Sequence, residues 1–352
     1  MDHQLHIPVE GGACFAVLHE PASPCRGGIL LCGPLFEEHK TSQRAMVELG
    51  RSLAATGYRA LRLDYTGCGD SPGDFADATV TRWVADITMA ATWLSGRVGG
   101  GPVGMFGLRF GAALAIQALA AGLEVQWLAL WEPMLSGEAM VQEELRKKLM
   151  KEMLTFGGSR QSREQLLAGL DRGDRLDADG YAISPDLYRQ LRQVGLPAAC
   201  PVLPGRVLIT SLTPGGSASR TAVEAGDWFE SQGAAVTARA VRHQPFWKLI
   251  GSVDCRELIA DTRDWVAALP PTTNAAAVGP TAEDELPLPV ADPGEEPLAL
   301  RVGDQSLLAV LHRPAGDGTP KAGIVFCHGW SGSRLGPHRM FVKMARRLAA
   351  QG

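Results

Sequence analysis

The sequence lacks the features that mark several large classes of protein. Its 34 Lys and Arg residues are outnumbered by 38 Asp and Glu, for a net charge of −4, and there is no basic run. This balance argues against a nucleic-acid partner. No apolar run reaches the roughly 18 residues of a membrane span, and the opening "MDHQLHIPVE" has neither the basic nor the apolar region of a signal peptide. We therefore expect a cytoplasmic protein without a membrane span.

Cysteines are few and scattered. The seven thiols are odd in number and never form a C-x-x-C pair. Such usage argues against a disulfide framework and against a zinc site, and it favours a reducing compartment. We expect no metal and no cofactor.

Two stretches of the chain resemble each other. Residues 15–57, "FAVLHEPASPCRGG…", align with residues 308–352, "LAVLHRPAGDGTPK…", so that Cys32 matches Cys327 and Gly57 matches Gly352. Each copy predicts a hairpin strand, a buried strand that ends at the cysteine, a polar loop and an amphipathic helix. The second copy stops where the first continues into "YRALRLDY".

This repeat predicts the domain organisation. Residues 1–268 are expected to form one complete α/β domain, and 297–352 the truncated start of a second. Residues 269–296, rich in Pro, Ala and acidic residues and without periodicity, are expected to form a linker.

Strand and helix patterns alternate through the first domain. Buried runs without alternation, such as "GGILLC", are typical of parallel strands covered on both faces. The expected strands are 13–19, 27–32, 58–64, 102–106, 125–131, 205–211 and 234–241, and the expected helices 41–56, 78–97, 110–121, 218–232 and 252–268. Repeated βα units predict a doubly wound, mostly parallel sheet.

The stretch from about 134 to 200 interrupts this alternation with charged helical sequence. In "MVQEELRKKLMKEML" the residues Val141, Leu145, Leu149 and Met153 recur every four positions, which predicts one apolar stripe on a polar helix. A second helix begins at "ISPDLYRQL", with Ser184 as N-cap. We interpret this stretch as a helical cap over the strand ends rather than a plain extension of the fold.

The segment "GMFGLRFGAALA", residues 104–115, predicts a strand end, a glycine-flanked turn and a helix. It follows the nucleophile-elbow pattern G-x-S-x-G of α/β-hydrolases, with Gly107 and Gly111 in place and Arg109 at the serine position. A guanidinium stays protonated and cannot attack a carbonyl. This elbow is therefore expected to support no acyl-enzyme chemistry.

Several motifs in order carry a more specific likeness. "PLFEEHKTSQRAMVELGRSLAATGYRALRLDYTGCGDSPGDFAD", "GLRFGA", "LALWEPMLSGEAM" and "PFW" together resemble the exosortase A system-associated hydrolases of type 2, which belong to the α/β-hydrolase superfamily. The likeness covers most of 1–268 and includes Arg at the elbow. It implies the α/β-hydrolase fold and a setting near exopolysaccharide and protein-sorting systems, but no particular substrate. The second copy, with "CHGWSGS", looks more like an ordinary serine hydrolase.

The remaining parts of a catalytic triad are weak in the first domain. No carboxylate follows "RVLITSL" until Glu224, and His243 near the last strand is a doubtful base. Ser71 in "GCGDSPGD" is an alternative nucleophile, although such a turn is more often structural. Cys32 and Cys68 are alternative thiol nucleophiles, but buried cysteines are more often inert.

Arg109 lies at the N-terminus of the helix that begins near Phe110, where the helix dipole disfavours a cation unless an anion compensates. The anion is either internal or external. The internal candidates are Glu37, Glu38 and Glu132. An external carboxylate or phosphate would be bound by Arg109 with helix-terminal N–H groups. The residues expected around such a ligand are Gly33, Leu35, Glu37, Glu38, Arg109, Phe110 and Glu132.

Three functional hypotheses follow. In the first, a catalytically degenerate hydrolase domain binds an anionic or acyl ligand, or a partner. In the second, the domain is an active esterase or acyl hydrolase with a displaced serine or thiol nucleophile. In the third, the activity belongs to the missing remainder of the second hydrolase domain, and the first domain is its regulator or scaffold.

Overall fold

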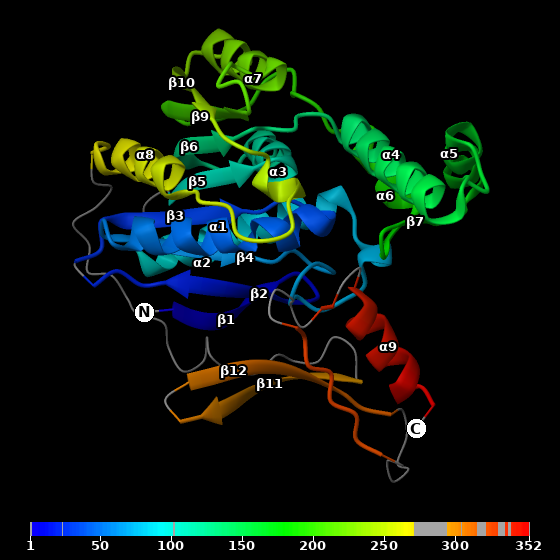
Figure 1. Cartoon of the computed structure of the whole chain (residues 1–352). Coiled ribbons are helices and arrows are strands. Elements are labelled where there is room, and N and C mark those ends of the chain that lie inside the picture. The colour runs from blue at the N-terminus through cyan, green and yellow to red at the C-terminus, as the bar shows by residue number, and fades with distance from the viewer. Residues whose placement is uncertain are drawn as a thin grey trace.

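A central eight-stranded sheet organises the first 270 residues of this computed structural model (Figure 1). The structure describes residues 2–22, 24–100, 103–270, 294–303, 305–314, 322–329, 335–336 and 339–351. The strands are β1 (Asp2–Val9), β2 (Gly12–His19), β3 (Gly27–Cys32), β4 (Tyr58–Leu63), β5 (Val103–Leu108), β6 (Val125–Trp131), β9 (Arg206–Thr213) and β10 (Ala235–Arg242). Their order in the sheet is β1-β2-β4-β3-β5-β6-β9-β10. The six strands from β4 to β10 are parallel, which confirms the predicted doubly wound sheet.

The antiparallel edge of the sheet contains one strand that the sequence patterns did not predict. β1 pairs with β2 along its whole length, from Asp2 opposite His19 to Val9 opposite Gly12. The alternation in "DHQLHIPV" buries Leu5, Ile7 and Val9 and leaves the residues between them more accessible. Such a short alternating pattern is a weak sequence signal for a strand. The strand itself is stabilised by its pairing with β2.

Helices cover both faces of the sheet. β3 shows why both are needed, because Leu30 packs into the core on one face while Ile29 and Leu31 pack into the core on the other. One face carries α1 (Phe36–Ala54) and α8 (Arg256–Ala267), and the other carries α2 (Val80–Arg97), α3 (Phe110–Ala120) and α7 (Arg220–Ser231).

α1 begins earlier than the sequence predicted. We expected a polar loop as far as residue 40, but the helix begins at Phe36 and carries Glu37 and Glu38 in its first turn. Carboxylates are favoured there by the helix dipole, so their polarity signals a helix start rather than a loop. Phe36 itself has a φ of 56°, a strained value for an aromatic residue, and its ring packs against Phe75 and Tyr181.

The segment between β6 and β9 forms the helical cap. It contains α4 (Gly137–Phe156), α5 (Arg163–Arg172), the short hairpin β7 (Leu176–Ala178) and β8 (Tyr181–Ile183), and α6 (Pro185–Leu191). Ser184 caps α6 as predicted, by accepting from the Leu187 N–H at 3.2 Å. The predicted apolar stripe on α4 is buried only in its first half: Val141 and Leu145 are enclosed, whereas Met153 is 61% exposed. No helix in the described part of the chain is long and apolar enough to cross a bilayer.

The C-terminal residues contain a second antiparallel hairpin and a helix. β11 (Glu295–Val302) pairs with β12 (Gln305–His312), and α9 (Met340–Ala349) follows. The strand expected over 322–327 is not formed, and Ile324 and Val325 are largely exposed. A parallel strand in that position needs neighbours on either side to complete its backbone hydrogen bonds.

The two hairpins share an ionic arrangement. In each, the carboxylate that begins the first strand pairs with the histidine that ends the second strand and with an arginine of the following helix. The two sets are Asp2, His19 and Arg51, and Glu295, His312 and Arg346. Both histidines and both arginines occupy matching positions of the sequence repeat.

Candidate functional site

Arg109 lies at the corner between β5 and α3, at the carboxyl edge of the sheet. Its backbone has φ 54° and ψ −122°, a combination that a non-glycine residue adopts only under strain. Three hydrogen bonds hold this conformation: the Arg109 N–H donates to the Trp131 carbonyl, and the Arg109 carbonyl accepts from the N–H groups of Ala112 and Met134, each at 3.1 Å. The backbone of a nucleophile elbow is therefore present although the serine is not.

The two flanking glycines explain how the corner fits. A Cβ at Gly107 would lie 2.6 Å from the Ala112 Cα. A Cβ at Gly111 would lie 2.3 Å from the Cys32 carbonyl oxygen and 2.5 Å from that of Gly33. These contacts are with backbone, which cannot move aside as a side chain can. The two glycines of the pattern are thus required by packing, whatever residue stands between them.

The Arg109 side chain turns into a buried group of charges. It is 8% exposed. Its Nε donates to Glu38 Oε2 at 3.3 Å, and its Nη2 donates to Glu143 Oε2 at 3.2 Å. The guanidinium also lies over the Trp247 ring, 5.0 Å from the centroid. One cation therefore joins α1, the cap helix α4 and the loop after β10.

Two lysines complete this group. Lys147 Nζ lies 2.7 Å from Glu144, 3.6 Å from Glu143 and 3.8 Å from Glu38. Lys248 Nζ lies 2.7 Å from Glu143 Oε1. We call Glu38, Arg109, Glu143, Glu144, Lys147 and Lys248 the elbow cluster; at full ionisation its three cations balance its three carboxylates.

The carboxyl groups of the elbow cluster respond differently to burial. Burial raises the pKa of Glu38, and Arg109 and Lys147 offset this only in part. Burial likewise raises the pKa of Glu144 despite its contact with Lys147. For Glu143 the effect of burial is outweighed by Lys248, Arg109 and Lys147, so its pKa lies below the usual range. Glu143 is therefore the most firmly ionised partner of Arg109.

Only one of the three carboxylates expected to pair with Arg109 does so. Glu38 pairs with it as predicted. The Glu132 carboxylate instead accepts from the Leu212 N–H at 2.7 Å, because it lies beyond β6 on the side toward β9. Glu37 makes no ion pair with any residue that the structure describes. Glu143, Lys147, Lys248 and Trp247 were not predicted; the first two lie on the cap helix, whose position over the elbow depends on tertiary packing.

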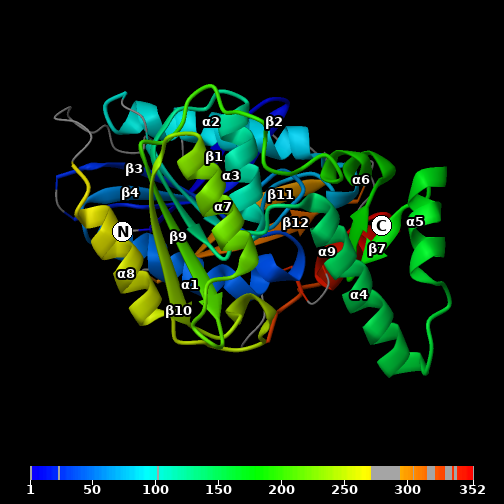
Figure 2. The ribbon, with the colours of Figure 1, turned by 90° about the horizontal axis from the view of Figure 1, so that it is seen from above.

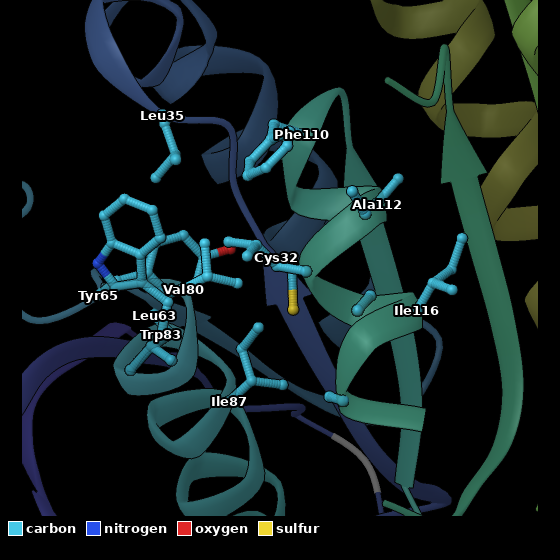
Figure 3. Packing of buried hydrophobic residues seen from close by; sticks show 14 of the residues in the cluster. Cys32, Leu35, Leu63, Tyr65, Val80, Trp83, Ile87, Phe110, Ala112 and Ile116 are labelled. Carbon is cyan, nitrogen blue, oxygen red and sulfur yellow. The ribbon is translucent and has the colours of Figure 1, made fainter. Parts of the chain in front are cut away.

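The other residues expected around a ligand are close to the elbow but engaged in packing. Leu35 and Phe110 are almost fully buried in the core that α2 and α3 share (Figure 3). The Gly33 carbonyl accepts from the Tyr65 hydroxyl at 3.0 Å. Pro34 follows it and has no N–H, so that position offers no oxyanion donor.

The predicted base and the alternative serine are held away from reactive roles. His243 Nδ1 lies 2.7 Å from the Gln244 carbonyl oxygen and Nε2 lies 3.0 Å from that of Asp254. The buried Ser71 hydroxyl donates to the Asp64 carbonyl and accepts from the Phe15 N–H at 2.8 Å. Ser71 thus ties the glycine turn to β2, and nothing in these contacts removes its proton.

The alternative thiols are enclosed. Figure 3 shows the Cys32 sulfur between α2, which contributes Ile87, and α3. Burial raises the pKa of Cys32 to about 12, and it raises the pKa of Cys68 still further. Thiols in such surroundings are poor nucleophiles.

A further buried pair lies at the end of β4. His39 in α1 lies with Nε2 3.0 Å from Asp64 Oδ1 at the end of β4. The Asp64 carboxylate outweighs burial and raises the pKa of His39. Asp64 also accepts from the Asp70 N–H, so the pair fixes the glycine turn against α1. Within the described residues, no group of three or more His, Cys, Asp or Glu could hold a metal ion.

Comparisons with known proteins agree with this architecture. The family described as serine aminopeptidase, S33, matches residues 39–168. No curated protein matches the chain. Est1E from Butyrivibrio proteoclasticus with bound ferulic acid is 18% identical, with a TM-score of 0.53 over 74% of this chain and 97% of that one.

Two further solved structures are similar at lower identity. DcsB in complex with its substrate analogue is 12% identical, with a TM-score of 0.52 over 76% of this chain and 98% of that one. The α/β hydrolase GrgF from Penicillium sp. sh18 is 13% identical, with a TM-score of 0.50 over the same shares. The first 270 residues thus have the α/β-hydrolase fold.

Proposed function

We propose that the first domain is a non-hydrolytic member of this fold, in which Arg109 has replaced acyl transfer by attachment of the cap. The observation that carries the proposal is the placement of the guanidinium between Glu38 of α1 and Glu143 of α4 at the elbow itself. A nucleophile is missing, His243 is turned toward carbonyl oxygens, and Ser71 is bonded on both sides. Loss of the nucleophile alone costs about a millionfold in kcat in a serine protease.

The ligand in this proposal is an anion or an acyl chain with a carboxylate, or a partner that presents one. Glu143 is less buried than Glu38 and has two other cations to pair with, Lys147 and Lys248. A carboxylate from outside can therefore replace Glu143 on Arg109 without leaving Glu143 unpaired. Release of α4 would accompany binding.

The setting in the proposal rests on the sequence motifs. Their likeness to the exosortase A system-associated hydrolases of type 2 supports a role beside an exopolysaccharide or protein-sorting system. The ionic arrangement common to the two hairpins supports the second part of the proposal, that the C-terminal segment repeats the opening of a second domain of the same fold.

Labelling with a fluorophosphonate tests the loss of hydrolysis. We expect no labelled residue in the first domain of the wild-type chain, and no change with Ser71→Ala. Stoichiometric labelling that Ser71→Ala abolishes would establish the displaced-nucleophile hypothesis instead.

Calorimetric titration with octanoate tests the anion site. We expect binding by wild type and weaker binding by Arg109→Met, with Arg220→Gln on the exposed start of α7 as the matched loss of one charge elsewhere. Equal affinity for wild type and Arg109→Met would reject the role of Arg109 in binding.

A further inference from the structure

The cap ends in a surface that the elbow does not use. The second half of α4 and the turn that leads into α5, residues 146–164, form what we call the cap tip. Figures 1 and 2 both show α5 and the distal end of α4 at one extreme of the molecule, away from the sheet.

Large apolar side chains of the cap tip are open to solvent. Leu154 is 82% exposed and Phe156 is 76% exposed. Met150 and Met153 are also mostly exposed. A hollow of about 410 Å³ lies along this face of α4, lined by Gln142, Arg146, Leu149, Met150, Met153, Leu154 and Arg163. Apolar side chains gathered on one protruding helix mark an interaction surface.

The charge of the cap tip is opposite to that of the whole chain. Residues 146–164 contain six Lys or Arg and two Glu, a net charge of +4, whereas the chain carries −4. Lys147 is turned inward to the elbow cluster, and Lys148 and Lys151 pair with Glu152 and Asp179. Arg146, Arg160 and Arg163 are exposed and form no ion pair with the residues that the structure describes. Arg146 and Arg163 thus border the apolar face, because both line the hollow.

We propose that the cap tip binds the surface of an anionic phospholipid bilayer. Leu154, Phe156 and the two methionines would enter the boundary between headgroups and acyl chains, and the three arginines would contact the phosphates. A helix with apolar residues on one face and cations at its border is the pattern of peripheral membrane binding, and the negative surface potential supplies the complementary charge. An acidic helix of another protein would supply the same negative charge as an anionic bilayer. A bilayer also presents a plane, which a protruding tip can contact more readily than it can contact a helix.

Co-sedimentation of the full chain with vesicles tests the proposal. Vesicles of phosphatidylglycerol and phosphatidylcholine in equal parts are compared with vesicles of phosphatidylcholine alone, at low and at high salt. We expect binding to the anionic vesicles only, weakened at high salt because exposed charges are screened.

Substitutions at the cap tip separate the contribution of its apolar side chains to vesicle binding from that of its arginines. Leu154→Ser is expected to weaken partitioning about tenfold or more, and Arg160→Gln with Arg163→Gln about fivefold for each charge removed. Ile250→Ser, at an apolar residue that is 93% exposed elsewhere, and Arg220→Gln are the matched controls and should bind as wild type does. All of these side chains are exposed, so thermal unfolding of the variants should match wild type.

Three results would overturn the proposal. The first is absence of binding to the anionic vesicles. The second is equal binding by Leu154→Ser and wild type. The third is light scattering that shows a dimer which Leu154→Ser converts to a monomer, because the surface would then be an interface between two copies of the chain.

Discussion

Replacing Arg109 by Met tests whether the elbow cluster holds the cap in place. Methionine keeps a long side chain against the Trp247 ring but removes the cation, so among the described residues Glu38 retains only Lys147, at 3.8 Å. Removing one partner of a buried ion pair costs about 3–5 kcal/mol, because the remaining charge stays buried. Glu143 keeps Lys248, so the lower end of that range, about 3 kcal/mol, is expected for Arg109→Met at pH 7.

A double-mutant cycle separates this cost from a simple loss of packing. Glu38→Gln removes the carboxylate that Arg109→Met leaves unpaired, and neutral groups are much cheaper to bury. The double variant Glu38→Gln with Arg109→Met should therefore regain at least half of the lost unfolding free energy. Urea unfolding followed by tryptophan fluorescence measures all four corners of the cycle.

The loss of stability in Arg109→Met should depend on pH, because it arises from the ionised Glu38. Burial raises the pKa of Glu38 above its ordinary value of 4.5, and loss of Arg109 raises it further. A carboxyl with a higher pKa in the folded state binds its proton more tightly there, so stability increases as the pH falls through that folded pKa toward 4.5. The deficit of Arg109→Met should shrink over that window. A deficit under about 0.5 kcal/mol at pH 7, or one that Glu38→Gln does not reduce, would refute the reasoning.

Two further predictions concern the backbone of the elbow and the thiols. Gly111→Ala should destabilise the chain severely or prevent folding, because its Cβ would lie 2.3 Å from a backbone oxygen. The control is Gly226→Ala in α7, where the nearest neighbours of the added Cβ lie at 3.9 Å; in urea unfolding it should be neutral or stabilise by up to about 1 kcal/mol. Iodoacetamide at pH 7.5 should modify the exposed Cys327 in the native chain and leave Cys32 and Cys68 unmodified until denaturant is added. Mass spectrometry of tryptic peptides measures the modification of each thiol. Rapid labelling of either buried thiol in the native chain would contradict the packing described.

The sequence predicted the parts of the fold that depend on a short local pattern, such as an apolar run or a pair of glycines. β3 and β5 come from continuous apolar runs, GGILLC and VGMFGL, which are typical of strands covered on both faces. The corner at Arg109 was predicted from Gly107 and Gly111, where an added Cβ would lie 2.6 Å and 2.3 Å from backbone atoms.

The parts that the sequence did not predict depend on contacts between distant segments. β1 is stabilised through its pairing with β2, and β7 and β8 are strands of three residues that pair with each other. Glu143 is one carboxylate among several on a polar helix, and nothing in its neighbours in sequence distinguishes it. Its pairing with Arg109 arises because α4 packs over the elbow, which no local pattern encodes.

The backbone conformation at position 109 is determined by the surrounding residues and not by the side chain of residue 109. Two glycines, a carbonyl from β6 and two amides fix the backbone. The backbone of the corner is thus independent of the side chain at position 109, although the elbow cluster depends on that side chain. In the proposed function, the residue at position 109 decides whether this corner presents a nucleophile or attaches the cap. Arg109→Ser would place a hydroxyl at the corner while the His243 ring nitrogens stay directed at the carbonyl oxygens of Gln244 and Asp254.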